Sequence, residues 1–198
     1  MVQPVTTPVA QEPDLTSLSL LTAGLVIAAV TMTFGVMITV FLSRAEAGIY
    51  WGHIAIPGVL WITTAVLLTS SATFEAARRA LARNQQESAS RLIKWTTGLG
   101  FAFLLGQLTA WFQVLKSGVI LAKNPHSWFI FLFTGLHGLH IILGLGGLVY
   151  LVFRTREPVG GPKYQSKTRA ITMGVSLYWH YLDFLWVVLF GLLVFWHR

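Results

Sequence analysis

Residues 127–153 read SWFIFLFTGLHGLHIILGLGGLVYLVF and contain no Asp, Glu, Lys or Arg. A helix rises about 1.5 Å per residue, so about 20 such residues cross the hydrocarbon core of a bilayer. Four further runs have the same character: residues 16–43, 54–74, 95–115 and 170–197, the last interrupted only by Asp183. The sequence therefore predicts an all-α integral membrane protein, a bundle of five transmembrane helices in one domain (16–198). Residues 1–15 are predicted to form an extended tail.

Composition supports a membrane protein over a soluble one. The 198 residues are 55% hydrophobic and only 11% charged, whereas soluble domains carry about 25% charged residues. The chain has no cysteine, which excludes disulfides, thiolate metal sites and a cysteine-based binuclear copper centre. The tail has no Lys or Arg and the first run is long, so we expect no cleavable signal peptide.

The basic residues behind the net charge of +7 are distributed unevenly among the loops. Ten basic residues lie in two loops, and only four lie in the other two loops and at the C-terminus. Cytoplasmic loops of membrane proteins carry an excess of Lys and Arg. The pattern predicts a cytoplasmic N-terminus and an external C-terminus, and it explains the basic charge without nucleic acid. The ten residues are Arg78, Arg79, Arg83, Arg91, Lys94, Arg154, Arg156, Lys163, Lys167 and Arg169.

Small residues indicate close helix packing in two runs. Run 95–115 contains four small residues, each four positions after the one before, and run 127–153 is rich in glycine. Small side chains let helix backbones approach closely in lipid. The predicted packing residues are Gly98, Ala102, Gly106, Ala110, Gly135 and Gly138.

Five polar residues fall well inside the runs: Gln107, His137, His140, His180 and Asp183. Counted from the predicted cytoplasmic helix ends, Gln107 lies about 18 Å deep, and His140 and Asp183 lie about 19.5 Å deep. An aspartate at this depth is costly and should face a partner. We therefore expect Asp183 to accept a hydrogen bond from a histidine, with Gln107 completing a structural network.

Two other interpretations of the five residues remain open at this point. Neutral imidazole is a good iron ligand, so His137 and His180 from two helices could hold a haem. Ionisable groups near the midplane also mark proton or ion pathways, although a single aspartate makes a poor relay.

Two motifs resemble a known family. TGLHGLH at 134–140 and WHYLDFLW at 179–186 are similar to segments of subunit III of haem–copper oxygen reductases, in the five-helix bacterial form. The matching positions are Gly135, His137, Gly138, His140, His180, Asp183 and Trp186, with Gln107 where the family often has a glutamine or glutamate. Four acidic positions of the family fall on uncharged residues here, around 28–31 and at Pro57, Ala110 and Met173.

The resemblance implies a function in aerobic respiration. It implies an accessory, non-redox subunit of a proton-pumping cytochrome c or quinol oxidase in the bacterial plasma membrane, with no catalytic centre, haem or copper of its own. The expected partners are subunit I, which bears haem and copper, subunit II, and phospholipid held between helices. The expected roles are to stabilise subunit I and sustain proton uptake, and His180 and Asp183 would join the fourth and fifth spans.

Two alternatives have different consequences. A related accessory protein of a nitric oxide reductase or another respiratory complex would differ only in its partner. An independent membrane haem protein or transporter would have to hold a cofactor or substrate by itself.

Overall fold

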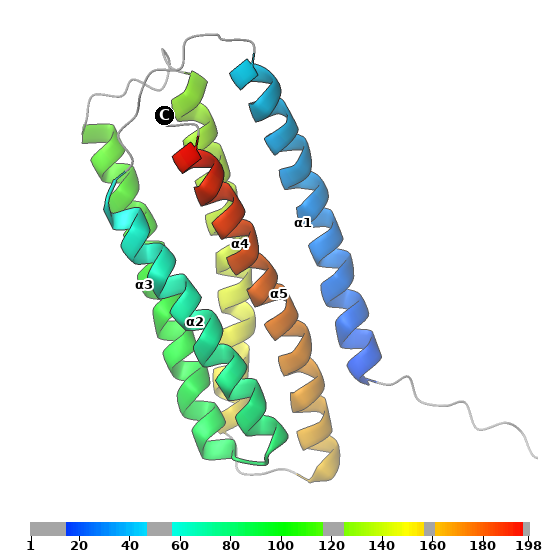
Figure 1. The fold of residues 1–198 in the computed structure, drawn as a ribbon. Helices are drawn as coiled ribbons and strands as arrows, with labels where there is room; N and C mark the ends of the chain where they lie inside the picture. Colours follow the sequence, from blue (N-terminus) through cyan, green and yellow to red (C-terminus); the bar gives the residue numbers. More distant parts are fainter. Residues whose placement is uncertain (1–14, 47–56, 117–124, 157–160, 196–198) are drawn as a thin grey trace, which may run out of the picture.

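Five long helices make up the computed structural model, which describes residues 15–46, 57–116, 125–156 and 161–195 (Figure 1). Every one of them is long and apolar enough to cross a membrane, which confirms the predicted all-α membrane bundle. Apart from Leu15, the predicted tail lies outside the described residues. The helices are α1 (Leu15–Glu46), α2 (Val59–Ala82), α3 (Gln86–Lys116), α4 (Pro125–Arg156) and α5 (Pro162–Phe195).

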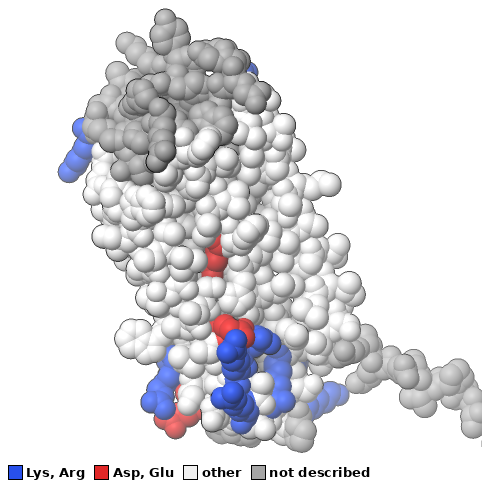
Figure 2. Space-filling model, viewed as in Figure 1, with Lys and Arg blue, Asp and Glu red and all other residues white. Residues whose placement is uncertain are grey.

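Three helices extend beyond their charge-free runs at one end of the bundle. α2 continues to Ala82, α3 begins at Gln86 rather than at 95, and α5 begins at Pro162 rather than at 170. The added turns contain Ala, Arg, Glu, Gln and Lys, which are good helix formers and tolerate water. We call this end, which holds the α2–α3 turn and the start of α5, the basic end. Figure 2 shows most of the visible Lys and Arg side chains gathered there.

The tight turn between α2 and α3 depends on a left-handed residue. Asn84 has a φ of 60°, and asparagine is among the few residues that adopt this conformation readily. The turn closes α2 because Gln85 N donates to Ala80 O at 2.9 Å, a common form of helix C-cap. The Asn84 side chain then accepts a hydrogen bond from Arg169 Nη2 at 2.6 Å. This bond ties the turn to the start of α5.

Helices α2, α3, α4 and α5 form a compact group, and α1 stands beside it (Figure 1). Among the described residues, α1 packs along α5, meets α4 through side chains such as Phe41 against Phe133, and makes no contact with α2 or α3. At one crossing, Gly174 of α5 lies against the Ser19 carbonyl, 3.0 Å from where a Cβ would stand. Ser19 Oγ donates to Ala170 O at 2.7 Å. The contact between α1 and α5 is therefore backbone-close at this point.

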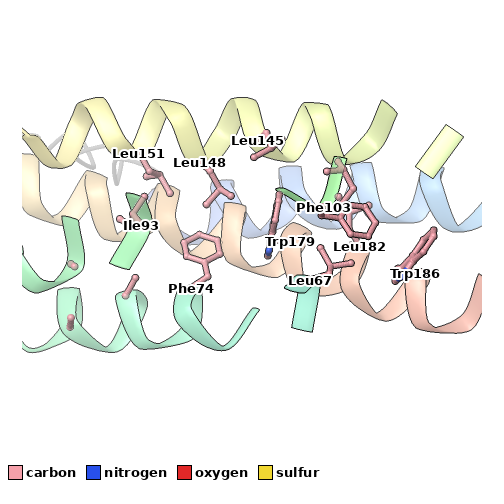
Figure 3. Close-up of a cluster of buried hydrophobic side chains, with 14 of the residues drawn as sticks. Leu67, Phe74, Ile93, Phe103, Leu145, Leu148, Leu151, Trp179, Leu182 and Trp186 are labelled. Carbon is pink, nitrogen blue, oxygen red and sulfur yellow. The ribbon is translucent and has the colours of Figure 1, made fainter. Parts of the chain in front are cut away.

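The main core lies between α2, α3, α4 and α5 (Figure 3). Trp179 is fully buried at its centre. Its ring occupies the space over Gly100 of α3 and Gly144 of α4, which a Cβ at either position would meet at 2.9 and 3.0 Å. Two glycines thus make room for one large side chain from α5.

The predicted packing glycines of α4 do face another helix. A Cβ at Gly135 would lie 3.4 Å from the Trp111 ring, and one at Gly138 would lie 4.0 Å from Leu104, both on α3. Both glycines thus lie at ordinary contact distance from side chains of α3, and their role as packing residues stays a prediction.

The predicted row on α3 divides in two. Gly106 faces Thr63 of α2 so closely that a Cβ would overlap the Thr63 methyl group, and Ala110 is buried. Gly98 has nothing near its missing Cβ, and Ala102 is exposed, so the first half of the row does not pack against another of the described helices. A helix has 3.6 residues per turn, so a step of four drifts about 40° and the row winds around α3.

Candidate functional site

A stripe of hydrogen bonds joins α2 to α5 through the membrane-spanning part of the bundle. Trp179 Nε1 donates to Ser70 Oγ at 3.1 Å, and Trp186 Nε1 donates to Thr64 Oγ1 at 3.0 Å. A buried indole needs such an acceptor. Between these two bonds lie His180 and Asp183 of α5 and, facing them, Ser71 of α2. We call this the α2–α5 seam: Thr64, Ser70, Ser71 and Glu75 with Trp179, His180, Asp183 and Trp186.

His180 binds α2. Its Nδ1 lies 2.5 Å from Ser71 Oγ, and its Nε2 lies 4.0 Å from Glu75 Oε2. The imidazole also packs against Phe74, with the ring centroids 6.4 Å apart. The expectation that His180 joins the fourth and fifth spans is wrong, because its side chain faces the second span. Its side chain is 35% exposed, so the seam is open at this point.

Asp183 lies deeper in the seam and is 3% exposed. The Ser71 hydroxyl lies close to its carboxyl, yet neither carboxylate oxygen has a hydrogen bond of normal geometry within the described residues. The expected hydrogen bond from a histidine to Asp183 is therefore absent from this part of the chain. Because one turn of α5 separates Asp183 from His180, both side chains point toward α2, and His180 uses Ser71 instead.

The two histidines of α4 meet different neighbours. His137 is fully buried against Phe103 and Trp186, with ring centroids 6.0 and 5.1 Å away, and neither of its ring nitrogens is bonded within the described residues. His140 Nδ1 lies 2.7 Å from the Leu136 carbonyl of its own helix, and its ring packs on Phe34 of α1. Since His137 lies against Trp186 and His180 against Ser71, the two rings do not face a shared iron position.

Gln107 completes the set of predicted polar residues. It is 5% exposed, and its Nε2 makes only a long contact of 3.5 Å with Thr63 Oγ1 of α2, while its Oε1 is unbonded within the described residues. The structure thus places Gln107, His137 and Asp183 inside the four-helix group as buried, under-satisfied polar groups. It places His180 at the seam and His140 toward α1. The role of the five residues as a structural network stays a prediction.

The α2 side of the seam was missed by sequence reasoning, which ranked residues by charge and by depth. Ser and Thr occupy 63, 64, 70 and 71, two pairs seven residues apart. Seven residues are two helical turns, so the pairs share one face. That spacing was the available signal for a polar stripe on α2.

A lipid-facing groove lies on another side of α5, between α5, α1 and α4. Its volume is about 580 Å³, and its walls are mostly apolar. Leu18 and Val26 of α1 face Ile171 and Val175 of α5 across it, and Lys167 stands at the basic end. Its apolar lining is of the kind that suits an acyl chain. Elsewhere in the described residues, no three side chains of His, Asp or Glu come together as a metal site.

Comparison with known proteins gives one consistent answer. The sequence model of the family described as "Cytochrome c oxidase subunit III" matches residues 21–198. A "Probable cytochrome c oxidase subunit 3" of Mycobacterium bovis is 29% identical over 163 residues, which are 78% of this chain and 76% of the relative. A "Cytochrome c oxidase subunit 3" of Synechocystis is 29% identical over 138 residues, 70% of this chain and 55% of the relative. One of Corynebacterium diphtheriae has the same identity over 138 residues, covering 70% and 65%.

Proposed function

Because the chain belongs to the cytochrome c oxidase subunit III family, and is thus an accessory, multi-pass membrane subunit of a haem–copper oxidase, we propose how it serves that complex. It packs against subunit I and subunit II of a bacterial plasma-membrane oxidase, holds phospholipid, stabilises subunit I and sustains proton uptake. Electron transfer and oxygen reduction take place on the haem and copper of the partner subunits, and this chain supplies no catalytic centre.

The observation that supports this proposal best is the position of the family motifs. TGLHGLH and WHYLDFLW lie on α4 and α5, where Trp186 is bonded to α2 and His137 is packed between Trp186 and Phe103. These side chains make their contacts inside the bundle, an arrangement that suits a supporting subunit. The concentration of basic residues at one end supports a cytoplasmic position for that end and for the N-terminus.

Purification in mild detergent tests the proposal. We expect the chain to copurify with a large multi-span partner and with the haem and copper spectrum of that partner, measured as a reduced-minus-oxidised difference. The same chain expressed alone is expected to show no haem signal. Haem retained by the lone chain would contradict the proposal, and copurification with a nitric oxide reductase would replace the oxidase by that complex.

The groove between α1, α4 and α5 leads to a prediction about lipid. Replacing Lys167 by glutamine is expected to lower the anionic phospholipid retained by the purified complex about fivefold, since one basic residue near the membrane surface contributes about 1 kcal/mol. The matched control is Lys94→Gln, which removes an exposed lysine of α3 at the same end but outside the groove.

Mass spectrometry of the extracted lipid, normalised to protein, gives the ratio for each variant. A Lys167→Gln complex that keeps as much anionic lipid as the control would show that Lys167 holds no headgroup. Equal loss in both variants would mean that only the total charge of the basic end matters.

A further inference from the structure

The α2–α5 seam connects a buried carboxyl with the basic end of the bundle. From Asp183, which is 3% exposed, the path passes the nearby Ser71 hydroxyl. Ser71 Oγ lies 2.5 Å from His180 Nδ1. His180 Nε2 lies 4.0 Å from Glu75 Oε2. Glu75, on the last turns of α2, is paired with Arg78 and Arg79 at 2.8 Å.

These contacts correct one premise drawn from the sequence. A single aspartate makes a poor relay, and Glu75 was counted with the loops. In the structure Glu75 faces the seam, so a second acid stands at the other end of the path. Figure 2 shows acidic atoms among the blue side chains at the basic end and further acidic atoms in the uncharged region above them.

The surroundings of Asp183 offer few other charges. Across the seam, α2 presents Glu75 and Arg78. α4 contributes His137 and His140, whose rings pack against Phe103, Trp186 and Phe34. The described Asp, Glu, Lys and Arg residues of α1 and α3 lie at the helix ends. An ionised carboxyl without a partner is costly in this environment, and a protonated one is much less so.

We propose that Asp183 is a proton-binding site that exchanges its proton with the basic end of the bundle through Ser71 and His180. A proton from water at the basic end passes Glu75, reaches His180 Nε2 and forms the imidazolium. The imidazolium then passes its Nδ1 proton to Ser71 Oγ, while the Ser71 hydroxyl proton passes to the Asp183 carboxylate. The products are a neutral imidazole, an intact hydroxyl and a carboxylic acid, and the reverse sequence releases the proton.

The geometry suits each transfer. A hydroxyl hydrogen rotates freely, so Ser71 can turn from His180 toward Asp183. The 4.0 Å between His180 and Glu75 is too long for a direct hydrogen bond and suits one bridging water. Although Asp183 is buried, Ser71 and His180 thus connect its carboxyl with water.

This inference goes beyond the proposed function, because it concerns one side chain of this chain and requires no turnover of the complex. The test is infrared spectroscopy of the resting, purified complex on transfer from H₂O to D₂O. A protonated carboxyl gives a C=O stretching band that shifts on deuteration, and the Asp183→Asn variant identifies the band of Asp183. The rate of the shift is then the rate of proton exchange.

We expect Ser71→Ala to slow this exchange about tenfold or more, the effect of about 1.4 kcal/mol on the barrier. His180→Gln, which keeps a polar contact to Ser71 but cannot relay a proton, is expected to slow it similarly. Ser70→Ala is the matched control, because its hydroxyl bonds Trp179 and the Leu67 carbonyl, and it should exchange at the wild-type rate.

Three results would overturn the proposal. The first is a carboxyl spectrum that Asp183→Asn leaves unchanged at every pH. The second is an exchange rate that neither Ser71→Ala nor His180→Gln alters. The third is equal slowing in Ser70→Ala, which would show that the effect is not specific to the path through Ser71 and His180.

Discussion

Replacement of Trp179 by alanine is expected to lower the free energy of unfolding of the bundle by about 3–5 kcal/mol. The indole is fully buried and contacts three helices at once: it lies over Gly100 of α3 and Gly144 of α4, and it donates to Ser70 of α2. The two glycines themselves have no side chain to move into the vacated space, and the neighbouring Leu145 and Leu182 can fill it only in part. The cavity would therefore stay open, and the dispersion contacts around it would be lost.

Reversible denaturation of the purified chain in detergent micelles, followed by circular dichroism, measures this loss. Trp95→Ala serves as the control because Trp95 is 70% exposed and its removal creates no internal cavity. We expect the control to stay within about 0.5 kcal/mol of wild type, as is usual for surface positions. Similar losses in both variants would show that Trp179 is not the centre of the core.

The second large effect is expected from Gly106→Val, which should destabilise the bundle by about 1–3 kcal/mol through overpacking. A side chain at this position would overlap the Thr63 methyl group on α2. Thr63 cannot turn away without loss, since its Oγ1 donates to Leu60 O at 3.1 Å and contacts Gln107 Nε2. The two helices would have to separate at this crossing.

Gly98→Val on the same helix is the control, because it adds the same side chain without the overlap. It introduces the same side chain with the same change in helix propensity, but nothing lies within 4 Å of its Cβ. The difference between the two variants in the micelle denaturation experiment is the cost of the clash. If Gly98→Val were as destabilising as Gly106→Val, the effect would belong to helix propensity and not to packing.

The number and type of the helices could be predicted from the sequence because the bilayer imposes a length and a hydropathy on each span. Which face of each helix meets which neighbour could not be predicted in the same way. The row from Gly98 to Ala110 illustrates this, because it winds around α3 and only its second half packs. Gly100, which does accept the Trp179 ring, stands outside the row and was not singled out.

The candidate site likewise has one feature that could be predicted from the sequence, the depth of its residues, and one that could not, their partners. Depth along a helix is a one-dimensional quantity, so the residues near the midplane could be identified by counting. Their partners depend on the rotation of each helix about its axis. Sequence proximity favoured α4 as the partner of His180, whereas the structure gives Ser71 of α2, which is 109 positions away. Because serine is uncharged, a search for charged residues does not detect Ser71.

The packing of α1 has a consequence for the order in which the protein is made. α1 is made before the other four helices, but the helix it packs along is α5, the last of the five in chain order, and 151 positions separate Ser19 from its acceptor at Ala170. Until α5 has entered the membrane, α1 can make only its side-chain contacts with α4, such as Phe34 with His140 and Phe41 with Phe133. Its own apolar length is sufficient to keep it there, since its span is the most hydrophobic of the five. The bundle is therefore complete only once α5 has been made, and a nascent chain that stops before α5 leaves α1 without the helix along which it packs.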